Sequence, residues 1–112
     1  MTTLIGQDRS PFKTSAYQYI RSTDKLPSTD EAAAQDNPLC KVKLFGGGSW
    51  TWYVAGYDPE TGLAFGVVDG FEKEIGDFDL NELKAVRTRP FGLPIERDLW
   101  WTPKTAEELL RE

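Results

Sequence analysis

The segment from residue 49 to residue 70, SWTWYVAGYDPETGLAFGVVDG, constrains the fold of this chain more than any other. Its first half is rich in aromatic and β-branched residues, which favour β-strands. A turn follows, because Pro59 presets its own backbone dihedral and Gly62 tolerates a positive φ. The sequence therefore predicts an antiparallel hairpin over residues 49–68. Strict alternation would place the first strand's side chains on two faces, with Trp50, Trp52 and Val54 on one and Thr51, Tyr53, Ala55 and Tyr57 on the other.

Further strands and three short helices are expected around this hairpin. Residues 41–45, 71–78 and 95–101 alternate between apolar and polar side chains and predict additional strands. Each helix is expected to open with a capping box, in which a residue and its third successor bond each other's backbone. The capping pairs are Ser28 with Glu31, Asp79 with Glu82, and Thr105 with Glu108. The fold class is therefore α+β, a small curled antiparallel sheet of four to five strands with two to three short helices.

The chain length supports one packed domain. A chain of 112 residues has room for a single core. We expect residues 1–20 to form an N-terminal arm, with a short helical piece at residues 15–20, and residues 21–112 to form the α+β domain. An arm that docks on a second copy would make the protein a homodimer. Because no long apolar run is present and Cys40 is the only cysteine, we expect a cytoplasmic protein that does not enter a membrane.

The composition excludes several kinds of chemistry. The chain contains no histidine and only one cysteine. Catalysis by Ser-His-Asp or Cys-His groups is therefore excluded, as is a cysteine-based zinc site. The run Gly46–Gly48 lacks the lysine and hydroxyl residue that end a phosphate-binding loop, so it predicts a hairpin connection. We expect no catalytic residue, no metal and no cofactor, and we interpret the chain as a non-enzyme.

The negative charge of the chain is concentrated in one stretch. The net charge is −5, and residues 58–82 contain eight acids against the single base Lys73, which gives that stretch −7 and the remainder +2. This balance argues against direct binding to nucleic acid, which requires cationic side chains. The simplest interpretation is a solvated face and helix caps, and the functional one is an acidic surface that docks on a basic patch of another protein. The predicted partner surface comprises Asp58, Glu60, Asp69, Glu72, Glu74, Asp77 and an exposed Trp100.

Two of these acids also permit a catalytic interpretation. On a strand, Glu72 and Glu74 would project from one face about 6–7 Å apart, a spacing that suits acid–base work or a divalent cation. Lys73 lies between them, however, and alternation with Phe71 and Ile75 is more typical of a solvated sheet edge.

The segment Glu96-Arg97-Asp98 is the other candidate site. If it is a strand, Arg97 shares a face with Ile95 and Leu99, and a charge among apolar neighbours requires a carboxylate partner. Arg97 would then form a structural lock with an acid from a neighbouring strand, or alternatively grip an acid of a partner or ligand. The adjacent Trp100 and Trp101 cannot both enter one core from a regular strand, so one should be exposed.

Two motifs give the chain a family resemblance. The first runs from Trp50-Thr-Trp-Tyr53 through Asp58-Pro59 to the Glu74-x-Gly-x-Phe-x-Leu-x-Glu-Leu83 stretch, and the second is GLPIERDL at residues 92–99. Together they resemble domain-of-unknown-function family 2958, small proteins of plasmids, phages and other mobile elements. Gly56 departs from the family pattern, where an acid is frequent, as do Asp77 and Asp79, where Tyr and Ser are more usual. The resemblance implies a mobile-element setting without an assigned activity, and it singles out Glu74 and residues 96–98 for testing.

Three functional hypotheses follow from these observations. The leading one is a non-enzymatic accessory protein of a phage or plasmid that binds another protein, such as a host or defence factor, through its acidic surface. The second is a carboxylate- or metal-dependent hydrolase that uses Glu74, Glu96 and Asp98. The third is a small structural protein that assembles through its N-terminal arm. Convergence of Glu74, Glu96 and Asp98 in one recess would favour the hydrolase.

Overall fold

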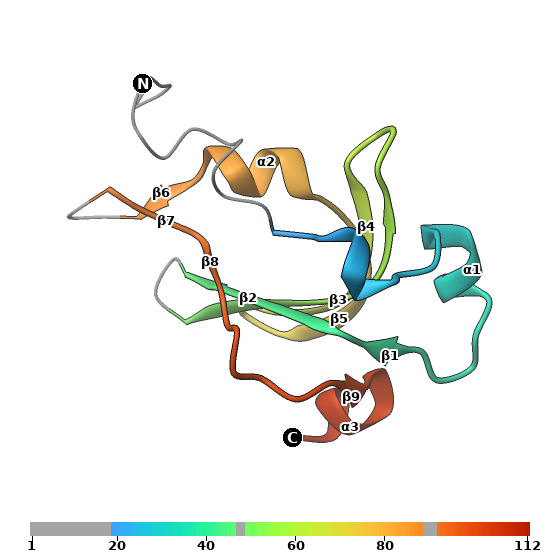
Figure 1. Cartoon of the computed structure of the whole chain (residues 1–112). Coiled ribbons are helices and arrows are strands. Elements are labelled where there is room, and N and C mark those ends of the chain that lie inside the picture. The colour runs from blue at the N-terminus through green and yellow to red at the C-terminus, as the bar shows by residue number, and fades with distance from the viewer. Residues whose placement is uncertain (1–18, 47–48, 89–91) are drawn as a thin grey trace.

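A computed structural model of the chain describes residues 19–46, 49–88 and 92–112 (Figure 1). Within these residues the main element is a five-stranded antiparallel sheet of order β5-β4-β3-β2-β8. In that order the strands are β5 (Lys73–Asp79), β4 (Leu63–Asp69), β3 (Trp50–Asp58), β2 (Val42–Gly46) and β8 (Glu96–Arg97). The predicted hairpin is formed by β3 and β4, and β5 is its predicted third strand. The α+β prediction is confirmed.

Shorter elements complete the fold. Two small strand pairs join β1 (Leu39–Cys40) to β9 (Lys104–Thr105) and β6 (Arg87–Thr88) to β7 (Leu93–Pro94). The helices in the described part of the chain are the 3-10 helix η2 (Ser22–Asp24), α1 (Thr29–Ala33), α2 (Leu80–Ala85) and α3 (Ala106–Arg111). No helix in the described part of the chain has the length and apolar character needed to cross a membrane.

The helices begin at the residues that their capping patterns indicate. The Ser28 hydroxyl accepts from the Glu31 amide at 3.1 Å, and the Glu31 carboxylate accepts from the Ser28 amide at 3.0 Å. Thr105 and Glu108 form the same reciprocal pair at α3. At α2 the carboxylate of Asp79 accepts from the Asn81 amide at 2.8 Å, one residue earlier than a capping box with Glu82 requires. Local side-chain bonds therefore fix all three starts.

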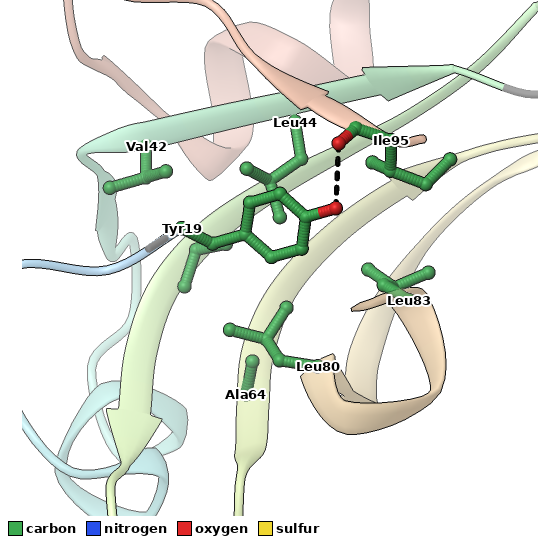
Figure 2. Close-up of a cluster of buried hydrophobic side chains, with 8 residues drawn as sticks. Tyr19, Val42, Leu44, Ala64, Leu80, Leu83 and Ile95 are labelled. Atoms are coloured by element: carbon green, nitrogen blue, oxygen red, sulfur yellow. Dashed lines mark hydrogen bonds between the residues drawn. The ribbon is translucent and has the colours of Figure 1, made fainter. Parts of the chain in front are cut away.

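The sheet buries apolar side chains on both faces. α2 lies over one face and α3 over the other (Figure 1). The first cluster is closed by side chains from several segments (Figure 2): Tyr19, Val42, Leu44, Val54, Ala64, Leu80, Leu83 and Ile95. The second cluster comprises Ala32, Cys40, Tyr53, Ala55, Val67, Ala106 and Leu109. Because the central strands are covered twice, functional side chains must lie at the sheet's ends and edges.

A β-bulge in β3 changes the predicted faces of that strand. Val54 pairs with Gly66, but Gly56 pairs with Phe65, so Ala55 is an extra residue. Tyr57 therefore packs with Trp52 and Val54 against the first cluster, and its predicted placement with Tyr53 is wrong. The bulge also receives α1, because a Cβ at Gly56 would lie 2.7 Å from the Ala32 Cβ and from the Ser28 carbonyl oxygen.

The predicted N-terminal arm and the predicted strand over residues 95–101 also differ from the structure. The predicted arm falls largely on residues 1–18, which lie outside the described residues, as do Gly47 and Gly48 of the glycine run. Tyr19 is 2% exposed and donates from its hydroxyl to the Ile95 carbonyl oxygen at 2.6 Å, so it is part of the core (Figure 2). The strand predicted over residues 95–101 is wrong beyond Arg97, because the Asp98 carboxylate accepts from the Trp100 amide and turns the chain.

The cross-strand glycines Gly66 and Gly76 provide a test of this register. They face each other in β4 and β5, but a Cβ at Gly66 would run into the Tyr53 carbonyl oxygen, whereas a Cβ at Gly76 would meet no atom within 4 Å. We expect Gly66→Ala to lower the free energy of unfolding by about 2–4 kcal/mol. Gly76→Ala should leave it unchanged or raise it by up to about 1 kcal/mol. Urea denaturation measures both, and equal effects would contradict the register.

Candidate functional site

The acids of residues 58–82 lie in two groups at opposite ends of the hairpin. Asp58 and Asp79 both pair in register with Leu63 at the start of β4, whereas Asp69 lies at its other end. Since β4 has seven residues, the groups are about 20 Å apart. Glu60 belongs to the first group, Glu72 and Glu74 belong to the second, and Asp77 lies between them on β5. The predicted partner surface is therefore divided.

The first acidic group is mainly structural. The Asp58 carboxylate accepts from the Thr29 hydroxyl at 2.7 Å and from the Thr29 amide at 3.0 Å, and these bonds lower the pKa of Asp58. They tie the first turn of α1 to the end of β3. Asp79 caps α2. Both carboxylates therefore stabilise the start of a helix, and Glu60 is the exposed acid of the turn.

The second acidic group borders a recess of about 330 Å³. We call it the acid-aromatic recess, and it is lined by Trp50, Val68, Phe71, Glu72 and Glu74. The Trp50 and Trp52 rings stack with centroids 6.0 Å apart, and Phe71 meets Trp50 edge-on at 5.4 Å. Gly70 makes this arrangement possible, because any Cβ there would collide with the Trp50 ring. Phe71 is 94% exposed, which places a large apolar side chain in solvent beside two carboxylates.

The electrostatics of the recess favour a cation. Among residues 19–46, 49–88 and 92–112, no lysine or arginine forms an ion pair with Glu72 or Glu74. Lys73, the cation between them, instead donates to the Leu109 carbonyl oxygen at 3.0 Å and to that of Glu112 at 2.6 Å. Carboxylates beside aromatic rings attract ammonium or guanidinium groups, since the ring faces add a cation–π term. The recess therefore has the chemistry to bind a lysine or arginine side chain.

Arg97 is engaged inside the fold. Its guanidinium donates two parallel bonds of 2.8 Å to the Asp24 carboxylate and a third of 2.8 Å to the Tyr19 carbonyl oxygen. The Arg97 and Asp24 side chains are 14% and 12% exposed. The bonds from Arg97 lower the pKa of Asp24 below its ordinary value. Asp24 belongs to η2, so the carboxylate does not come from the neighbouring strand that the sequence suggested.

The neighbours of Arg97 point away from it. Glu96 is exposed, and the Asp98 carboxylate lies 3.7 Å from the Lys43 ammonium. Strand order places β8 and β5 at opposite edges of the sheet, about 19 Å apart for four strand spacings. Glu74 therefore does not converge with Glu96 and Asp98, which was the arrangement expected of a hydrolase. No cluster of three or more potential metal ligands occurs in the described part of the chain.

The consecutive tryptophans separate after β8. Trp100 is 94% exposed beside Leu99, which is 61% exposed. Trp101 turns the other way and packs against Tyr53, with ring centroids 5.4 Å apart. Trp100 follows β8, the strand at the sheet edge opposite β5, and it is not among the residues that line the acid-aromatic recess.

Three residues that line the recess, Trp50, Val68 and Phe71, are absent from the partner surface that the sequence predicts. Alternation places Trp50 on one face of the first hairpin strand with Trp52 and Val54, and it places Phe71 in the strand of residues 71–78. The sequence signal for the recess is a large apolar residue, Phe71, that lies between Gly70 and Glu72, directly after an expected turn.

Cys40 is fully buried, and burial raises the pKa of its thiol to about 12. It therefore stays protonated at neutral pH and is a core residue.

Fold and site together define a small α+β protein with a doubly covered antiparallel sheet and an acid-aromatic recess at one end. The family described as "Protein of unknown function (DUF2958)" matches residues 18–108, and the chain belongs to that family. The match begins next to Tyr19 and includes both members of the Arg97–Asp24 pair. No curated protein and no solved structure matches the chain.

The Arg97–Asp24 pair makes a prediction about acid stability. Asp24→Asn leaves a largely buried guanidinium without its counter-charge, so we expect unfolding free energy at neutral pH to fall by about 3 kcal/mol. Because the folded pKa of Asp24 is lowered, the wild-type stabilisation is complete above the unfolded value of about 3.9 and is lost as pH falls through the folded pKa. The difference between wild type and variant should therefore shrink below about pH 4.

Urea denaturation between pH 2 and pH 7 measures this difference. Asp36→Asn, which neutralises an exposed acid, is the matched control and should follow the wild type across the range. Arg97→Lys tests the geometry, since an ammonium cannot supply two parallel bonds. A constant wild-type advantage over Asp24→Asn down to pH 2 would contradict the assigned role.

Proposed function

We propose that this protein binds another protein through the acid-aromatic recess and acts as a non-enzymatic accessory factor of a phage or plasmid in the bacterial cytoplasm. The observation that supports the proposal is the pairing of an exposed Phe71 with two carboxylates, Glu72 and Glu74, that lack a cationic partner among the described residues. The mobile-element setting rests on the family resemblance alone.

The chemistry of the recess favours a protein as the ligand. Aromatic side chains such as Trp50 and Phe71 supply much of the energy of protein interfaces because they bury a large area with little entropy loss. The flanking carboxylates add long-range attraction for a basic surface and speed association. Nucleic acid is a poor match, because the phosphate backbone would meet Glu72 and Glu74 at the same place.

Capture of a partner from bacterial lysate tests the proposal. The immobilised protein should retain a partner at low salt and release most of it at high salt, because added ions screen exposed charges. Glu72→Gln with Glu74→Gln should reduce retention about tenfold. The control pair Glu60→Gln with Glu82→Gln removes the same charge from exposed positions away from the recess and should change retention by less than about twofold.

Two results would count against this function. Equal loss in the recess variant and the control variant would mean that net charge alone causes retention. Failure to retain any partner at either salt concentration would remove the support for a protein ligand. A third variant, Phe71→Ser, separates the aromatic contribution, and because Phe71 is almost fully exposed it should unfold at the wild-type urea concentration.

A further inference from the structure

The outer side of β5 is an open sheet edge. β5 is the first strand in the sheet order and has seven residues. Two backbone bonds continue the β4–β5 ladder beyond its ends: Gly70 N–H donates to Glu72 C=O at 3.2 Å, and Leu80 N–H donates to Gly62 C=O at 2.9 Å. They show which residues of β5 direct their backbone groups toward β4. Since alternate residues of an antiparallel strand bond to the same neighbour, even-numbered residues face β4. Lys73, Ile75 and Asp77 therefore direct their N–H and C=O groups outward.

These outward groups have no protein partner within the described residues. Among residues 19–46, 49–88 and 92–112, no hydrogen bond from outside the β4–β5 ladder reaches the backbone N–H or C=O of Lys73, Ile75 or Asp77. The strand is accessible along this line, because Ile75 is 45% exposed and Asp77 is exposed. Gly76 leaves open space on the face that carries Glu74. Such an edge is a template for one more strand.

We infer that this edge receives an extended basic segment of the partner, which adds a sixth strand beside β5. The inference rests on the proposed function and specifies its ligand. Glu72, Glu74 and Asp77 lie along this edge, whereas Lys73, the single cation in the sequence of residues 71–79, donates to carbonyl oxygens at the end of α3. A second copy of this chain would bring two such acidic edges together, and like charges oppose that pairing. A basic segment is complementary in both backbone and charge.

The acid-aromatic recess indicates where the basic side chains fall. In an added strand, a residue opposite Glu74 has its side chain on the same face, with the two Cβ atoms about 5 Å apart. A lysine or arginine there meets the Glu74 carboxylate and reaches the rings of Trp50 and Phe71. The next side chain on that face lies over Gly76, where space is open. The expected segment therefore carries basic residues at alternate positions.

Amide hydrogen exchange measured by NMR tests this arrangement. The probe is the peptide acetyl-Lys-Val-Lys-Val-Lys-amide, and acetyl-Glu-Val-Glu-Val-Glu-amide is its matched control. In the free protein the amides of Glu74, Gly76 and Phe78 should already be protected by β4. The lysine peptide should slow exchange at Ile75 and Asp77 at least about tenfold at saturation, and the glutamate peptide should have no effect.

A proline substitution on the outward side tests the backbone bonds directly. Asp77→Pro removes an N–H that faces away from β4, and proline is tolerated at such edge positions, particularly after a glycine. Asp77→Asn removes the same charge and keeps the N–H. We expect Asp77→Pro to bind the lysine peptide about tenfold more weakly than Asp77→Asn, with circular dichroism confirming that both are folded.

The outcomes separate this inference from the proposed function. Peptide-induced shifts of Trp50 and Phe71 signals without protection of Ile75 and Asp77 would overturn strand addition and leave a recess-only binding mode. Failure of the lysine peptide to bind would also overturn it, while lysate capture would still decide the function. Protection of Ile75 and Asp77 that rises with protein concentration, without peptide, would assign the edge to a second copy instead.

Discussion

The ion pair between Arg97 and Asp24 fixes the β8 edge of the sheet to the segment that begins at Tyr19. β8 contains only two residues, so its own ladder with β2 is short. Arg97 strengthens it by bonding Asp24 and the Tyr19 carbonyl oxygen, while the Tyr19 hydroxyl bonds the Ile95 carbonyl oxygen. These bonds join residues 19–24 to residues 95–97, two segments that are far apart in the sequence. A partly buried charge pair stabilises a fold only if both of its members are hydrogen-bonded, and the two parallel bonds from the Arg97 guanidinium to the Asp24 carboxylate meet this requirement.

Local patterns predicted the parts of the fold that local interactions determine. The β3–β4 hairpin follows from a turn with Pro59 and Gly62, and α1 and α3 begin where a hydroxyl and a glutamate three residues later cap each other. The residues that make these contacts are close together in the sequence, so a short stretch of sequence is enough to predict them. The family match agrees with the same motifs.

Non-local pairing explains what the sequence did not reveal. The partner of Arg97 is 73 residues away in the chain, and the pattern around Arg97 shows only that a carboxylate is needed. The bulge at Ala55 depends on α1 approaching Gly56, which no alternation rule includes. The acid-aromatic recess is lined by residues from the start of β3, from the β4–β5 connection and from the strands on either side of that connection. Its members are recognisable only when the register is known, because each residue alone resembles core or solvated edge.

The charges on β5 reconcile two demands on an open sheet edge. An edge with free N–H and C=O groups invites pairing with any extended chain, including another copy of itself. Acidic residues that are repeated along the edge disfavour the self-pairing, since both copies would present the same sign, yet they favour a segment of opposite sign. Lys73 would weaken this discrimination if it lay along the edge, but its ammonium is held by the carbonyl oxygens of Leu109 and Glu112. The position of α3 beside β5 thereby preserves the negative edge, which links the packing of the second face to the selection of a partner.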